Sequence, residues 1–74
     1  MARANEQELL KAFGKRVAEV RKSKGMKQYE LAKAVDMHVV TIAYIEKGKR
    51  WVRLSTLDRL AKTLKVKISD LMDF

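Results

Sequence analysis

Residues 28–48 read QYELAKAVDMHVVTIAYIEKG, and this stretch decides the fold. Its apolar residues recur every three or four positions, as they do on one side of a helix, with a short break at Asp36. The pattern predicts one short helix over residues 28–35 and a second over residues 39–47, which Gly48 ends. Two short helices joined by so tight a turn form a unit that can insert its second helix into a groove.

The sequence on either side of this stretch predicts three more helices. An apolar stripe predicts a long helix over residues 6–24, and Gly25 ends it because glycine readily adopts the left-handed conformation after a last turn. Ser55, followed three residues later by Asp58, resembles a capping box with Asp in place of Glu, and predicts that a fourth helix opens there. A last helical turn is expected around residues 69–72. The expected core consists of Leu10, Phe13, Val17, Val20, Leu31, Ala32, Val35, Ile42, Ile45, Leu57, Leu60, Ala61, Leu64, Ile68 and Leu71, with Phe74 as a further candidate.

The composition agrees with an all-α fold of five helices. The chain has no proline and only three glycines, and no stretch alternates between apolar and polar residues as a strand would. We expect a single compact domain over residues 1–74, with residues 1–6 as a flexible N-terminus. A core of this size leaves little stability to spare, so self-association as a homodimer is a plausible reinforcement.

The charge of the chain points to a polyanionic partner. Seventeen basic residues against nine acidic ones give a formal net charge of +8 and a pI near 10.1. Nucleic acid and an anionic membrane surface both fit this charge. Separate apolar stripes joined by helix stops indicate a closed core, however, and no apolar run is long enough to cross a bilayer. We therefore expect no membrane association.

The sequence offers little from which to build a catalytic or metal site. It has no cysteine, one histidine (His38), and no paired carboxylates in a recognisable motif. We expect no enzyme activity, no metal, no cofactor and no small-molecule substrate. Residues 1–7 lack the apolar stretch of a signal peptide, so a cytoplasmic protein is expected, associated with the nucleoid if its source is prokaryotic.

Many positions also agree in type and spacing with a known family: Gln28, Leu31, Ala32, Val35, Met37, Thr41, Ile42, Ile45, Glu46, Gly48, Leu57, Leu60, Ala61, Leu64, Val66 and Leu71. From about Phe13 to Phe74 the chain resembles the Cro/C1-type helix-turn-helix family, also called Xre-like. The resemblance implies a compact lambda-repressor-like domain that binds double-stranded DNA. Its helix-turn-helix would lie at residues 28–35 and 39–47.

The resemblance also implies one structural role and one binding role. Arg21 and Glu46 would form an ion pair between helices, and Gln28 would meet a phosphate at the start of its helix. The chain departs from the family where Asp36 and Lys65 replace glycines. The hydroxyl residues that usually cap helices are also replaced, by Lys27, His38 and Lys67.

The exposed face of the predicted helix over residues 39–47 is expected to contact base edges. The expected base-reading residues are His38, Val39, Val40, Thr41, Ala43 and Tyr44. Among them Val39, Val40 and Ala43 can make only apolar contacts, most naturally with the methyl groups of thymine. In the alternative interpretation Val40 joins the core, or the patch binds a protein.

Two further sets of residues are expected on the surface. The expected phosphate-binding residues are Gln28, Lys27, Lys47, Lys49, Arg50 and Arg53. About a third of a further basic set on the helix surfaces is expected to add phosphate contacts, namely Lys15, Arg16, Lys22, Lys24 and Lys27. The candidates for a dimer interface are Trp51, Val52, Leu71, Met72 and Phe74. Trp51 could pack over the following helix, donate its indole N–H to a phosphate, or join the dimer contact.

These features support two hypotheses about function. The first is a sequence-specific transcriptional regulator, most simply a repressor, that binds a palindromic operator as a homodimer. Controller proteins of restriction-modification systems and phage regulators are plausible contexts. The second is a protein-interaction module, such as an antitoxin-like protein that holds a partner through its apolar face. The affinity for DNA should fall steeply with salt only under the first hypothesis.

Overall fold

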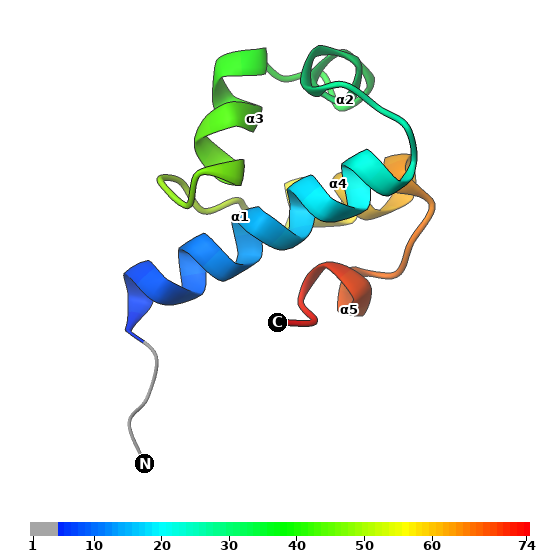
Figure 1. The fold of residues 1–74 in the computed structure, drawn as a ribbon. Helices are drawn as coiled ribbons and strands as arrows, with labels where there is room; N and C mark the ends of the chain where they lie inside the picture. The colour runs from blue at the N-terminus through cyan, green and yellow to red at the C-terminus, as the bar shows by residue number, and fades with distance from the viewer. Residues whose placement is uncertain (1–4) are drawn as a thin grey trace.

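The computed structural model describes residues 5–74, which form five helices and no strand (Figure 1). The helices are α1 (Glu6–Ser23), α2 (Gln28–Ala34), α3 (Val39–Glu46), α4 (Leu54–Leu64) and α5 (Ile68–Leu71). The predicted all-helical fold is therefore confirmed, and the stated bounds lie within one residue of the observed ones except at the start of α4. No helix among these residues has both the length and the hydropathy needed to cross a bilayer.

The long helix α1 is the element on which the others are arranged (Figure 1). It packs against α3 on one side and α5 on the other, while α2 packs against α3 and α4 against α5. The side chains between them form one buried cluster: Phe13, Val17, Val20, Leu31, Ala32, Val35, Ile42, Ile45, Val52, Leu57, Leu60, Ala61, Leu64 and Leu71. Thirteen of these fourteen were expected from the helical spacing, and Val52 is the addition.

Four of the helices end in the same way. Gly25, Asp36, Gly48 and Lys65 follow α1 to α4 with φ of 70°, 57°, 74° and 58°, in the left-handed region. The N–H of the next residue donates to a carbonyl five positions back, which is the Schellman arrangement. These bonds run from Met26 to Arg21, Met37 to Ala32, Lys49 to Tyr44 and Val66 to Ala61. Asp36 and Lys65 thus occupy positions that favour glycine, as predicted.

The starts of the helices differ more from the prediction than their ends do. The predicted capping box at Ser55 is wrong, because α4 begins at Leu54 with Arg53 as its N-cap and no side-chain cap bond. Ser55 instead lies inside the first turn. The N-caps Lys27, His38 and Lys67 make no side-chain cap bonds either, as their chemistry predicted. The carboxylates of Glu30 and Asp70 reach back to accept from the backbone N–H of Lys27 and Lys67, each at 2.8 Å.

The start of α1 corrects the prediction of a flexible segment over residues 1–6. Residues 1–4 lie outside the described part of the chain. Asn5, however, is the N-cap of α1, and its side-chain oxygen accepts from the backbone N–H of Glu8 at 2.8 Å. Glu6 is the first helical residue, so Asn5 and Glu6, the last two residues of the segment that was expected to be flexible, belong to the start of α1.

The backbones of α1 and α3 touch directly. A Cβ placed on Gly14 would overlap the carbonyl oxygen of Ile45 and lie 2.8 Å from that of Glu46. A Cβ placed on Gly48 would lie 2.6 Å from Cα of Lys11. No side chain fits between the helices at these two points, so the glycines fix how closely α3 approaches α1.

We expect Gly14→Ala to lower the free energy of unfolding by about 2–3 kcal/mol. Overlap with a backbone carbonyl outweighs the gain of about 1 kcal/mol in helix propensity that alanine brings. Urea unfolding followed by circular dichroism measures the change. Gly25→Ala is the matched control because no atom lies within 4 Å of its added Cβ and only its φ of 70° is strained. The control should cost about 1 kcal/mol, and a Gly14→Ala variant no less stable than this control would contradict the close approach.

Candidate nucleic-acid interface

Helix α3 is apolar on both of its sides. Ile42 and Ile45 face the core and are 0% and 1% exposed. On the other side Val39, Val40 and Tyr44 are 42%, 57% and 47% exposed. The alternative in which Val40 joins the core is therefore wrong. Val39, Val40 and Tyr44 form a short exposed face that is largely apolar, and we call it the α3 face.

The remaining residues predicted to read bases border this face. His38 precedes α3 as its exposed N-cap, and the side chains of Thr41 and Ala43 are partly exposed. Val40 and Tyr44 are one turn apart, as are Val39 and Ala43, so the four project from adjacent positions on the helix surface. All six predicted residues thus share one exposed surface.

Basic residues lie at the C-terminal end of α3, in the loop that follows it, and at the start of α2. Lys47 is the C-cap of α3, and Lys49, Arg50 and Arg53 lie in the loop between α3 and α4. These four residues and Lys27 at the start of α2 are all exposed. The ion pairs found within residues 5–74 join Arg21 to Glu46 and Lys62 to Asp58, so they involve other cations. The charges beside α3 therefore face solvent, where they attract an anionic partner.

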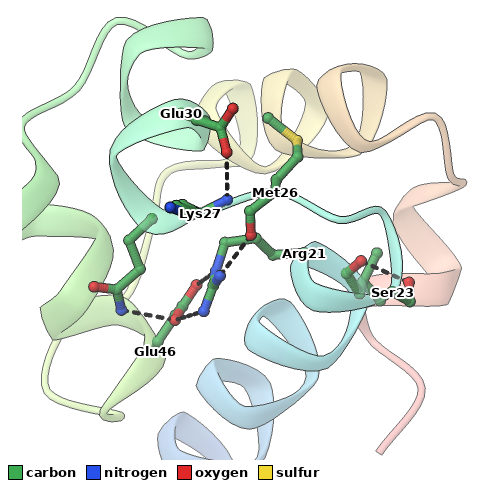
Figure 2. Close-up of polar contacts among 8 residues, drawn as sticks. Arg21, Ser23, Met26, Lys27, Glu30 and Glu46 are labelled. Carbon is green, nitrogen blue, oxygen red and sulfur yellow. Dashed lines mark hydrogen bonds and ion pairs between the residues drawn. The ribbon is translucent and has the colours of Figure 1, made fainter.

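A partly buried ion pair anchors α3 to α1. Nε of Arg21 donates to Oε2 of Glu46 at 2.6 Å, and its Nη2 donates to Oε1 at 3.0 Å. The third nitrogen, Nη1, donates to the carbonyl of Met26 at 2.7 Å (Figure 2). The two side chains are only 8% and 6% exposed. The predicted ion pair is confirmed, and it also ties the turn after α1 to the end of α3.

Gln28 joins the same network, which the sequence did not predict. Its Nε2 donates to Oε1 of Glu46 at 2.9 Å, so Glu46 links α1, α2 and α3. The amide retains one further N–H, and a phosphate contact by Gln28 would have to use that one. Arg16, which belongs to the further basic set, donates through Nε to the carbonyl of Asp70 at 2.7 Å. Helical spacing in the sequence does not predict the bond from Gln28 to Glu46 or the bond from Arg16 to Asp70, because the partners in each bond lie far apart along the chain.

A second apolar surface lies at the N-terminal end of α1. The ring of Trp51 packs on Phe13 with 4.7 Å between ring centroids, and that of Phe74 lies 6.3 Å from Phe13. Trp51 and Phe74 remain about half exposed. Together with Glu6, Leu9, Leu10 and Met72 they line a shallow hollow of about 420 Å³. We call these residues the α1 hollow; Leu9 and Leu10 were not among the candidates for an interface.

Two of the predicted interface residues are buried inside the single chain. Val52 and Leu71 are 6% and 0% exposed and belong to the core cluster. Val52 is buried because the loop after α3 runs over the core, and Leu71 because α5 packs against α1 and α4. Of the five candidates, Trp51, Met72 and Phe74 are therefore the exposed ones.

Among the described residues, no group of three or more histidine or carboxylate side chains is arranged to hold a metal ion. Every buried side-chain nitrogen or oxygen there also has a hydrogen-bond partner. The exposed chemistry near α3 consists of apolar groups, hydroxyls and cations. Such a surface suits non-covalent binding to an extended anionic partner.

The chain is similar to known regulatory proteins. The helix-turn-helix family model (HTH_3) matches residues 17–71. The control protein C.BamHI from Bacillus amyloliquefaciens is 41% identical over 63 residues, which cover 84% of this chain and 78% of that protein. An uncharacterised HTH-type transcriptional regulator from Archaeoglobus fulgidus is 39% identical over 59 residues, covering 80% of this chain and 84% of the relative. The crystal structure of the restriction-modification controller protein C.AhdI from Aeromonas hydrophila matches with a TM-score of 0.81 at 32% identity, covering 84% of this chain and 94% of that one.

We expect Glu46→Ala to lower the free energy of unfolding by about 3–5 kcal/mol, because it leaves the partly buried guanidinium of Arg21 without its anion. Urea unfolding gives the change. The matched control is Asp58→Ala, which removes an exposed pair with Lys62 whose side chains are 46% and 77% exposed. That change should cost under about 1 kcal/mol. Equal losses in the two variants would show that the Glu46 network does not hold α3 in place.

Proposed function

This chain belongs to the helix-turn-helix family, as its sequence predicted, and we propose that it is a sequence-specific DNA-binding transcriptional regulator, most simply a repressor. The observation that carries the proposal is the exposed face of α3 together with the exposed cations that follow its C-terminal end and the exposed cation of Lys27 at the start of α2. A fixed helix with such exposed positive charges next to it has the shape and charge that the major groove of DNA accepts. We expect the protein to act in the cytoplasm.

In the proposed complex α3 lies in the major groove, which is about 12 Å wide and admits a helix. Val39, Val40 and Ala43 then contact the methyl groups of thymine. His38, Thr41 and Tyr44 can exchange hydrogen bonds with base edges or phosphates. The base sequence is therefore read largely through shape and apolar contact.

Affinity in this complex comes from the charges around α3. Lys27, Lys47, Lys49, Arg50 and Arg53 contact phosphates of the two strands, and Gln28 adds its free N–H. Each neutralised phosphate releases counterions, so binding weakens steeply as salt rises. These contacts position the protein but carry little sequence information.

We further propose that the protein binds as a homodimer through the α1 hollow. A small core and an exposed cluster of Trp51, Met72, Phe74 and Leu9 support self-association, because water contact with these side chains is unfavourable. A two-fold symmetric dimer presents two copies of α3 and therefore favours a palindromic operator. The similarity to C.AhdI supports control of restriction-modification genes as the context.

A protein-interaction module is the second candidate function, and the apolar face of α3 is the observation that favours it. Selection of duplexes from a random pool near 150 mM salt separates the two. A palindromic motif among the enriched duplexes supports the regulator. Enrichment of no motif, with salt-insensitive capture of a protein partner, supports the interaction module.

We expect Val40→Glu to lower the affinity for the selected duplex at least about 100-fold, because it brings a carboxylate toward the phosphates and removes an apolar contact. A fluorescence anisotropy titration measures the affinity. Ser69→Glu is the matched control: it adds the same charge at an exposed residue of α5, on the opposite side of α1 from α3 (Figure 1). It should change the affinity less than about threefold. Undiminished binding by a folded Val40→Glu variant would show that α3 does not lie in the major groove.

We expect Met72→Glu to convert the proposed dimer to a monomer, because it places a charge in the α1 hollow where the second copy packs. Sedimentation equilibrium at micromolar concentration gives the mass. Leu54→Glu is the control because Leu54 is 74% exposed and lies outside the hollow. This variant should stay dimeric. A wild-type protein that is monomeric with and without DNA, or a dimeric Met72→Glu variant, would rule out the hollow as the interface.

A further inference from the structure

The part of the α3 face that Val39 and Val40 form has no hydrogen-bonding group. These two side chains present only methyl groups, and the partly exposed Ala43 lies one turn after Val39. The side chains that can form hydrogen bonds belong to Tyr44, one turn after Val40, and to His38 and Thr41. If α3 occupies the major groove as proposed above, the base beneath Val39 and Val40 meets a purely apolar surface.

We infer that α3 reads the C5 methyl group of a pyrimidine and not the pyrimidine itself, so that 5-methylcytosine replaces thymine beneath Val39 and Val40. The inference rests on the proposed DNA-binding function. It names a further class of ligand for the same site, duplex DNA that carries 5-methylcytosine.

The chemistry of the two bases leads to this inference. Thymine and 5-methylcytosine carry the same methyl group at C5, at the same place in the major groove. They differ at C4, where thymine has a carbonyl oxygen that accepts a hydrogen bond and cytosine has an amino group that donates one. A side chain with a donor or an acceptor distinguishes them, whereas valine has neither.

The geometry of the valines makes such a contact favourable. Both side chains are branched at Cβ and hold one preferred rotamer in a helix, so their methyl groups are already in place before DNA binds. Val40 is 57% exposed and loses that water contact when a base methyl covers it. Burial of one methyl group favours binding about fourfold.

The decisive experiment changes only the methyl group. The probe is the highest-affinity duplex recovered from the random-pool selection. At each thymine of a half-site it is compared with the same duplex carrying uracil, which removes the methyl and keeps the adenine partner. A second comparison sets cytosine against 5-methylcytosine at that position, with guanine opposite both.

At one position per half-site we expect uracil to bind about fourfold more weakly than thymine, and cytosine about fourfold more weakly than 5-methylcytosine. Changing both halves of a symmetric site should give about 15-fold in each comparison. The Val39→Ala, Val40→Ala double variant should bring both ratios close to one. Leu54→Ala, which shortens an apolar side chain that is 74% exposed and lies outside both the α3 face and the α1 hollow, should leave both ratios unchanged.

The outcomes separate this inference from the proposed function. Specific binding of the selected duplex with every thymine-to-uracil ratio near one would overturn the inference and leave the function standing. A loss with uracil but no gain from cytosine methylation would also overturn it, because the C4 group would then be read. Failure to enrich any duplex would remove the proposed function, and the inference with it.

Discussion

Helix α3 rests directly on the backbone of α1, and the rest of the structure depends on this contact. Gly14 lies against the carbonyl oxygens of Ile45 and Glu46, where a single methyl group would not fit. An isolated helix of eight residues is not stable in water, so α3 takes its conformation and its direction from what it packs against. The Arg21–Glu46 pair then fixes the rotation of α3 about its own axis, because a bidentate contact between two planar groups tolerates little change in direction.

Because the inner face of α3 makes these contacts, the residues on its outer face are not needed to hold the helix in place. Ile42 and Ile45 supply the packing, Glu46 the polar connection to α1 and α2, and Val39 and Val40 remain exposed. Residues on that outer face can therefore change with little effect on stability. The network at Glu46 cannot change so freely, because the loss of one partner leaves a charge in a site with little water. In the proposed complex with DNA, the residues that hold the fold and those that read the base sequence would therefore lie on opposite sides of one short helix.

Much of the fold follows from the sequence because local rules decide it. Apolar residues every three or four positions fixed the five helices, and Asp36 and Lys65 stood where glycine was expected and adopt its left-handed conformation. The capping-box prediction at Ser55 failed because the N-cap residue of such a box must lie just outside the helix. Ser55 lies inside α4, which begins one residue earlier, at Leu54. The role of Gly14, the bond from Gln28 to Glu46 and the burial of Val52 depend on contacts between distant segments. Helical periodicity carries no information about such contacts.

The two exposed apolar surfaces are connected through α1. Its Gly14 side receives α3, while Leu9 and Leu10 at its N-terminal end line the hollow with Trp51 and Phe74. In the proposed dimer, a contact at the hollow would leave both copies of α3 free, and α1 would be the rigid element between each α3 and the partner. The separation of the two copies of α3 would then be set by α1 together with Trp51, Met72 and Phe74, which complete the hollow. A change in how α3 packs on Gly14 would therefore alter both the direction of α3 and the spacing of half-sites that the dimer can span.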